Sequence, residues 1–338
     1  MRPPEHWHLQ QRPNRSGLWW ALGLIALVIV GVLLVRPRLF DGDAAPSEVS
    51  AGCAVGTADA ECPTPLSSEV LPAAPGSWFA GEVSPPKITG RTAAVIDLPC
   101  GALLYAEDAH RRLAPASLTK IATALVAVAQ TPLSEMVTVR VNSALLASSS
   151  GSSVMGLKPG QRLSMRDLLY GLILPSGNDA GIAIAEHVAG SVPAFAEMMN
   201  DKVDELGLVN TRFANPHGLD DLDHYTTAYD MAMLGRALLA QPALAEIVAT
   251  ETYQPAWDGP QLWNGNKLLY NYFGTLGVKT GYTADAGQTI VAAAERGGRR
   301  LLVSVLGAWD HYADATVLLE WAFANTSPAC EEPAPEQT

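Results

Sequence analysis

The stretch "LAPASLTKIATALVAVA", residues 113–129, places a serine and a lysine three residues apart at the start of an otherwise apolar segment. Pro115 favours a helix start, and the apolar residues after Lys120 predict that 117–129 is helical. Residues i and i+3 share a helix face, so Ser117 and Lys120 are expected to touch. Desolvation by apolar neighbours lowers the pKa of a lysine and makes it a base for a serine proton. The stretch therefore predicts a nucleophile and its base, with free backbone N–H groups for an oxyanion nearby.

The S-x-x-K spacing is too short to be decisive alone, because it also occurs in "SPPK" at Ser84 and Lys87. Pro85 and Pro86 exclude that stretch from a helix interior, so its two side chains need not meet. We therefore interpret Ser84 as a chance match.

Two further motifs follow along the chain. "LPSGNDAG" places Ser176 and Asn178 in a loop between two predicted helices, and "GVKTGYT" places Lys279, Thr280 and Gly281 on a predicted strand. A Ser-x-Asn pair supplies a proton relay and a hydrogen-bond donor, and the lysine can hold a carboxylate. Taken singly, the first motif also fits an ordinary helix N-cap and the second an exposed edge strand.

Hydrophobic periodicity outlines the rest of the folded part. Residues 92–108 read as a hairpin that turns at Pro99-Cys100-Gly101, and 287–309 as a second one that turns at Gly297-Gly298. Helices are predicted at 164–174, 179–190, 192–207, 226–240 and 312–325, and a strand at 275–283. We expect the two ends of this region to share one sheet beside a helical lobe, with the site in the cleft between them.

An uncharged run, Leu18–Val35, has the length of a membrane-spanning helix, and Trp19 and Trp20 suit the interface at its end. It predicts a single-pass protein with a short cytoplasmic segment at 1–17 and its folded domain on the extracytoplasmic side. A cleaved signal peptide and a lipoprotein site at Cys53 are weaker alternatives.

Composition divides the remainder. Residues 36–76 are rich in Pro, Ala, Ser and acidic residues and read as a disordered linker; 77–328 form the folded domain, and 329–338 a disordered tail. The net charge of −12 argues against a nucleic-acid partner. The cysteines contain no C-x-x-C pair, so no metal site is expected; they are Cys53, Cys62, Cys100 and Cys330.

The three motifs in this order are the signature of penicillin-binding proteins and class A β-lactamases. "PASLTKIATAL", "DLLYGLILPSGNDAGIAIAEH", "NTRFANPHGLDDLDHYTTAYDMA" and "GVKTGYT" together resemble the low-molecular-weight penicillin-binding proteins, the serine-type D-alanyl-D-alanine carboxypeptidases. The resemblance covers about residues 80 to 326. It implies a β-lactamase/transpeptidase-like α/β (α+β) fold, with a five-stranded antiparallel sheet flanked by helices and a helical lobe. It also implies removal of the terminal D-alanine from peptidoglycan stem pentapeptides, with no cofactor, and β-lactams as covalent inhibitors.

The resemblance assigns roles to the residues that match the motifs. Ser117 is the expected nucleophile, Lys120 its base and Ser176 the relay to the leaving amine, while Asn178 orients the substrate amide. Lys279 and Thr280 are expected to bind the substrate carboxylate, beside Gly281, and the backbone N–H groups of Ser117 and Tyr282 to form the oxyanion hole.

Two departures from the family carry expectations of their own. His311 stands where relatives usually have an arginine that grips the carboxylate, which predicts binding that improves as pH falls through the histidine pKa between pH 8 and 5. In the family fold the first strand and the last helix run side by side, which suggests a Cys100–Cys330 disulfide and leaves Cys53 with Cys62. A free, buried Cys100 is the alternative.

Other readings stay open. His217 and His224 are interpreted as loop-shaping rather than catalytic. A DD-endopeptidase that cuts cross-links uses the same residues, and a β-lactam or muropeptide sensor without turnover is a non-enzymatic alternative. A class A β-lactamase is less favoured, because no matching glutamate loop lies between Asn178 and Lys279.

Overall fold

A computed structural model describes residues 83–257 and 259–330. The predicted cytoplasmic segment, membrane helix and linker lie outside the described residues, together with Cys53 and Cys62. Within the described ranges, no single helix is both long and apolar enough to cross a membrane. Two consecutive helices, 228–239 and 242–249, meet that criterion jointly but are bent by 106°.

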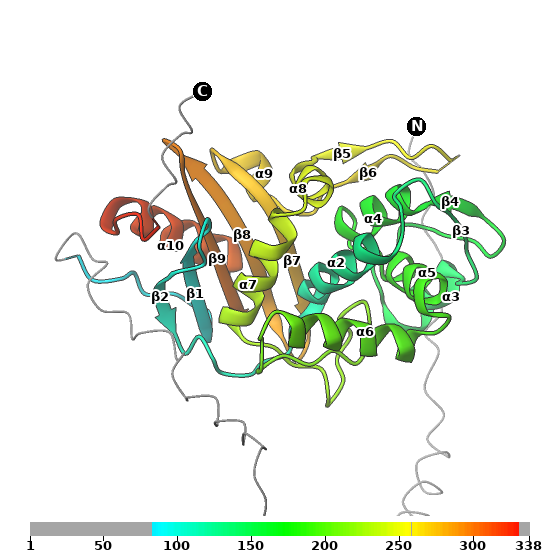
Figure 1. The fold of residues 1–338 in the computed structure, drawn as a ribbon, viewed down its shortest axis with the longest axis horizontal. Helices are drawn as coiled ribbons and strands as arrows, with labels where there is room; N and C mark the ends of the chain where they lie inside the picture. The colour runs from blue at the N-terminus through cyan, green and yellow to red at the C-terminus, as the bar shows by residue number, and fades with distance from the viewer. Residues whose placement is uncertain (1–82, 258, 331–338) are drawn as a thin grey trace, which may run out of the picture. The chain divides into compact units, whose positions relative to one another are not determined.

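The expected five-stranded antiparallel sheet is confirmed, and the two ends of the domain do share it (Figure 1). Its order is β2-β1-β9-β8-β7. The strands are β1 (Thr92–Asp97), β2 (Leu103–Glu107), β7 (Thr275–Thr283), β8 (Gly287–Arg296) and β9 (Arg299–Ala308). Every residue of β1 is buried, because helices cover both faces of the sheet. A strand covered in this way has no need of polar alternation, and its sequence "TAAVID" shows little.

Two hydrophobic cores lie on opposite faces of the sheet. On one face, α10 (His311–Asn325) packs against β8 and β9, where Trp321 meets Tyr105 edge to face. On the other face lie α2 (Lys120–Gln130) and α7 (Ala228–Leu239). A Cβ at Gly235 of α7 would come within 2.7 Å of Val291 on β8, so this glycine allows the helix to approach the sheet closely.

The helical lobe lies to the right of the sheet in Figure 1. The predicted helices are confirmed, with α4 at Met165–Ile173, α5 at Asn178–Ala189 and α6 at Val192–Glu205. Ser164, Ser191 and Thr227 cap α4, α6 and α7 through their side-chain oxygens. Several short elements were not predicted: β3 (Met136–Thr138), α3 (Ser143–Ser150), β4 (Arg162–Ser164), α8 (Pro242–Ala249), β5 (Thr252–Tyr253), β6 (Leu262–Trp263) and α9 (Leu268–Asn271).

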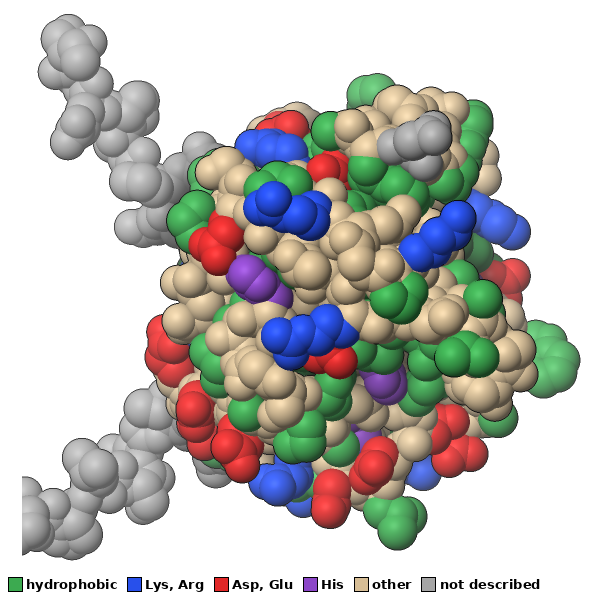
Figure 2. Space-filling view, turned by 90° about the vertical axis from the view of Figure 1, so that its right-hand side faces the viewer, with side chains coloured by type: hydrophobic (Ala, Val, Ile, Leu, Met, Phe, Trp, Pro, Cys, Tyr) green, Lys and Arg blue, Asp and Glu red, His purple; other side chains and the backbone are tan. Residues whose placement is uncertain are grey.

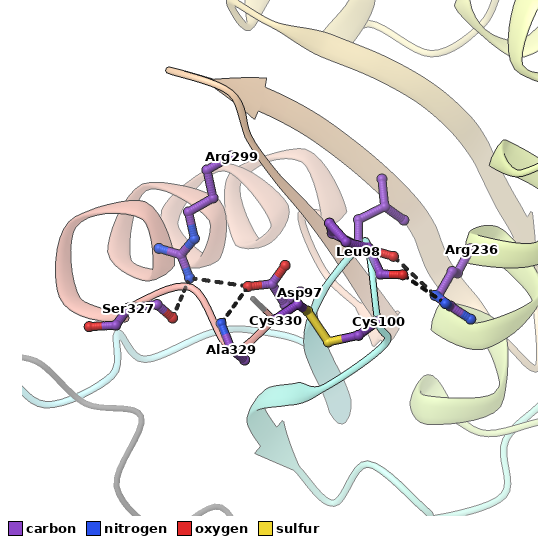
Figure 3. The surroundings of a disulfide bond; sticks show 9 residues. Asp97, Leu98, Cys100, Arg236, Arg299, Ser327, Ala329 and Cys330 are labelled. Carbon is purple, nitrogen blue, oxygen red and sulfur yellow. Dashed lines mark hydrogen bonds and ion pairs between the residues drawn. A yellow bond between two sulfur atoms is a disulfide. The ribbon is translucent and has the colours of Figure 1, made fainter. Parts of the chain in front are cut away.

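The suggested disulfide is present between Cys100, in the turn after β1, and Cys330, after α10 (Figure 3). Polar contacts fix the surroundings of the bond. Asp97 accepts a hydrogen bond from the Ala329 amide and lies 3.8 Å from the Arg299 guanidinium. Figure 3 also shows Arg236 of α7 reaching the carbonyls of the β1–β2 turn. Both ends of the folded region are thus attached to the sheet.

The face of the lobe shown in Figure 2 mixes charges of both signs. Lys and Arg side chains are separated from one another by polar and apolar ones, and acidic side chains are more frequent towards the lower edge of the view. No extended basic patch is visible on this face.

Candidate active site

The serine of the opening motif lies in a tight turn between the sheet and the lobe. Residues Ala116–Thr119 form a 3₁₀ turn and α2 begins at Lys120, so the prediction of a single helix from Ser117 was wrong in this detail. The predicted contact is nevertheless formed, with 2.8 Å between Lys120 Nζ and Ser117 Oγ. Ala116 has a φ of 51°, a left-handed conformation that costs a non-glycine residue about 1–3 kcal/mol.

Lys120 is fully buried, and its ammonium nitrogen has two more partners. Nζ lies 2.7 Å from the Asn178 side-chain oxygen and 2.7 Å from the His217 backbone carbonyl. Neither oxygen can donate a proton, so each takes one N–H of the amine. In the neutral amine only the lone pair is left, and it faces the hydroxyl of Ser117. This arrangement orients Lys120 as a proton acceptor for the serine.

Burial is the largest cause of a shift in the pKa of Lys120 well below its ordinary value. The nearby Lys279 lowers that pKa further, and Asp179 opposes the shift. The lowered pKa makes Lys120 a more available base than an exposed lysine.

A loop of the helical lobe that was not predicted holds Asn178 in place. The Asn178 side-chain amide donates to Ser152 Oγ over 2.9 Å, which fixes the amide oxygen towards Lys120. The next residue, Asp179, is buried and accepts hydrogen bonds from the backbone amides of Met155, Gly156 and Leu157. The signal in the sequence is the aspartate directly after the Ser-x-Asn motif, which was predicted only as part of a helix.

Ser176 also has a left-handed backbone, with a φ of 61°. Its hydroxyl is buried and has no hydrogen-bond partner among the described residues. The structure brings Ser117, Lys120 and Asn178 into direct contact, whereas Ser176 lies in the loop before α5 without a bond to any of them. Its predicted role as a relay stays a prediction.

Strand β7 carries the third motif alongside the serine turn. A Cβ at Gly281 would lie 2.7 Å from the backbone nitrogen of Ser117, so only glycine allows this approach. Lys279 is 3% exposed, and its Nζ donates to the Thr280 carbonyl over 2.9 Å. Burial lowers the pKa of Lys279 to about 7. Tyr282, by contrast, has an exposed side chain, which leaves its backbone as the part that could serve an oxyanion.

His311 is the candidate whose expected behaviour the structure revises. It is buried at the start of α10, and its backbone N–H and Nδ1 both face the side-chain oxygen of Gln288. Burial lowers the pKa of His311 to about 4. The expected gain of charge between pH 8 and 5 is therefore wrong, because a ring with this pKa is mostly neutral over that range.

The second S-x-x-K match, at Ser84 and Lys87, does not lie in a helix, as predicted. Ser84 and Lys87 are both exposed and lie outside every helix and strand. This pair offers matched controls for substitutions at Ser117 and Lys120.

The chain is similar in sequence and fold to known proteins. Residues 80–310 match the sequence family described as D-alanyl-D-alanine carboxypeptidase. The carboxypeptidase DacF of Bacillus subtilis is 37% identical over 242 residues, which cover 70% of this chain and 62% of that protein. The chain thus spans less than two thirds of the length of this relative.

Two solved structures align with this chain over all or nearly all of their own length. A D-alanyl-D-alanine carboxypeptidase from Mycobacterium tuberculosis has a TM-score of 0.68 and 33% identity, over 74% of this chain and 98% of that one. A DD-transpeptidase from Streptomyces has a TM-score of 0.69 and 30% sequence identity, and the alignment covers 72% of this chain and 100% of that one.

Proposed function

Because the chain belongs to the D-alanyl-D-alanine carboxypeptidase family, we propose that it removes the terminal D-alanine from peptidoglycan stem pentapeptides. The observation that carries this proposal is the placement of Lys120. Two carbonyl oxygens and the Ser117 hydroxyl surround its Nζ, so the lone pair of the neutral amine would face that hydroxyl. This is the arrangement that an acyl-transferring serine requires.

In the first half-reaction Ser117 Oγ attacks the carbonyl carbon between the two D-alanines as its proton passes to Lys120 Nζ. The negative oxygen that forms would lie between the backbone N–H groups of Ser117 and Tyr282. The C–N bond then breaks. The leaving D-alanine amine takes the proton held on Lys120, relayed through Ser176, whose hydroxyl has no other partner among the described residues.

Water completes the cycle by attacking the ester carbon as its proton passes to Lys120. The bond to Ser117 Oγ then breaks, and Lys120 returns the proton to Oγ. Lys279 and Thr280 would hold the carboxylate of the departing D-alanine before it leaves. The charged form of Lys279 binds that carboxylate, and Asn178 orients the substrate amide while its oxygen stays on Lys120.

The test is release of free D-alanine from a stem pentapeptide by the purified protein. We expect release that disappears in Ser117→Ala and persists in the matched control Ser84→Ala. A β-lactam should form a covalent adduct on Ser117 in the same preparation. Absence of both release and adduct would contradict the proposal.

A transpeptidase is the second candidate, favoured by the Streptomyces neighbour that aligns over its whole length. The acyl-enzyme would then pass to an acceptor amine instead of water. Adding such an amine separates the two, since a transpeptidase yields a new peptide in place of free acid. An endopeptidase would release fragments from cross-linked dimers.

We further propose a single-pass membrane protein with its domain on the extracytoplasmic side, supported by the uncharged run at Leu18–Val35. The measurement is protease accessibility of the domain in intact cells. Protection of the domain until the membrane is permeabilised would contradict this placement.

A further inference from the structure

His224 is a buried histidine whose two ring nitrogens are both engaged. The side chain is 2% exposed. Nδ1 lies 2.9 Å from the backbone nitrogen of Ala214, and Nε2 lies 2.7 Å from Thr119 Oγ1. A backbone N–H can only donate, so Nδ1 must accept, and the proton of the neutral ring is on Nε2. His224 therefore donates to Thr119.

The direction of the next hydrogen bond follows. Thr119 Oγ1 accepts from His224, so its own proton is free for the Ala116 carbonyl, 2.8 Å away. Ala116 is the residue with the left-handed backbone directly before Ser117. A strained conformation persists only where its surroundings hold it, and this chain of two hydrogen bonds reaches it from the protein interior.

The loop that carries His224 also reaches Lys120. His217, in the same loop, offers its carbonyl to Lys120 Nζ. Gly218 follows with a φ of 93°, and a Cβ there would overlap the carbonyl of Ala116. One loop thus touches the turn before the serine and the amine of its base.

Burial keeps the ring in the form that this chain needs. It lowers the pKa of His224 to about 4, although the carboxylates of Asp221 and Asp220 raise it and Lys120 lowers it further. At neutral pH Nδ1 therefore remains an acceptor for Ala214.

We propose that His224 is a positioning residue, which through Thr119 and the Ala116 carbonyl holds the turn that presents Ser117 to the substrate. The inference rests on the proposed function in one respect, namely that Ser117 is the nucleophile. His224 itself touches no reacting atom.

Two substitutions of His224 each keep the hydrogen bond of one ring nitrogen and remove that of the other. His224→Gln places an N–H donor where Nε2 lies and keeps the bond to Thr119. His224→Asn places a carbonyl acceptor where Nδ1 lies and keeps only the loop contact with Ala214. Thr119→Val removes the hydroxyl at nearly constant volume, and Thr119→Ser retains it.

The readout is the rate of Ser117 acylation by a fluorescent β-lactam, separated into the affinity of the first complex and the rate constant of bond formation. We expect His224→Asn and Thr119→Val to slow bond formation at least tenfold with little change in affinity. His224→Gln and Thr119→Ser should stay within about threefold of the unmodified protein, because each keeps the hydrogen bond between residues 224 and 119.

The double variant Thr119→Val with His224→Asn provides the decisive comparison. If the two residues act through one chain, its loss should equal that of either single variant. Losses that multiply, or equal rates for His224→Asn and His224→Gln, would overturn the proposal. If His224→Asn does not fold in a thermal melt, the Thr119 pair still tests the same link. Failure of the unmodified protein to acylate at Ser117 would instead overturn the proposed function.

Discussion

Two buried lysines lie at the centre of the site, and neither forms a salt bridge with a described carboxylate. Lys120 and Lys279 are 0% and 3% exposed, and their hydrogen bonds go to uncharged oxygens. Burying an ammonium without a counter-charge destabilises a fold. In the proposed reaction Lys120 is the base and Lys279 is the cation that binds the substrate carboxylate.

The pH dependence of substrate capture should follow the titration of Lys279. With a pKa lowered to about 7 by burial, the free lysine is charged below that pH and neutral above it. We therefore expect kcat/KM for D-alanine release to fall about tenfold between pH 8 and 9. Lys279→Arg should remove this fall, because its guanidinium stays charged. Identical profiles for the two proteins would assign the fall to another group.

The sequence predicted the contact between Ser117 and Lys120 because helical spacing alone determines it. It could not predict the carbonyl of His217 or the hydroxyl of Ser152 as partners of the site. Backbone carbonyls carry no sequence signature, and a serine in the run "SSSGSS" differs from its neighbours only through the path of its loop. The shift in the pKa of His311 was missed for the same reason, since burial is a tertiary property.

At the scale of elements, the loop between α3 and β4 depends on one carboxylate. Asp179 accepts three backbone amides of that loop as well as the hydroxyl of Ser143 on α3. The loop in turn carries Ser152, which orients Asn178. The first turn of α5 thus holds together a segment far from it in sequence.

Asp179→Asn should loosen this loop. An amide group brings N–H donors against backbone N–H donors, and hydrogen bonds to a charged group contribute more than neutral ones, so we expect a loss of about 3 kcal/mol of stability. Hydrogen exchange at 155–157 should accelerate, and acylation of Ser117 should slow. Asp201→Asn, on the exposed side of α6, is the matched control. Unchanged protection of these amides would contradict the assignment.

Long elements with apolar periodicity were predictable, as α6, α7, β8 and β9 show. The missed strands β3 to β6 have two or three residues each, which is too few for alternation to be recognised. Their pairing depends on neighbours distant in sequence. The 3₁₀ turn at Ser117 was missed because Pro115 and a helical pattern indicate where a helix begins but not the geometry of its first turn.

At the scale of the molecule, the Cys100–Cys330 bond joins residues 230 apart in sequence. It ties the segment after α10 to the β1–β2 turn, on the side where Arg299 and Asp97 also meet (Figure 3). Such a bond restricts the unfolded chain most strongly when it closes a long loop.

Replacing Cys100 and Cys330 together by serine should lower stability by about 3–5 kcal/mol, because the unfolded chain regains the freedom of the open loop. We expect the melting temperature to fall by about 10 °C or more. The acylation rate at 25 °C should stay unchanged, since the bond lies away from Ser117. The control pair is Cys53→Ser with Cys62→Ser in the predicted linker. Equal effects of the two pairs would contradict the prediction.

The sharing of one sheet by both ends of the domain could be predicted from the order of strands and helices. The disulfide rested on family resemblance, and spacing alone left three pairings open. The placement of the membrane run stays a prediction, as it lies outside the described residues.

The strand order also determines how much of the chain must be present before the sheet can form. Thr92 pairs with Leu306, and within the sheet β1 has only β2 beside it until β9 is available. An isolated hairpin is only marginally stable in water, so β1 and β2 stay largely unfolded until nearly the whole domain is present. In this incompletely folded state the apolar strands are exposed and prone to aggregate. A purified chain that ends before β9 should therefore remain sensitive to protease, while one extended through α10 should become resistant.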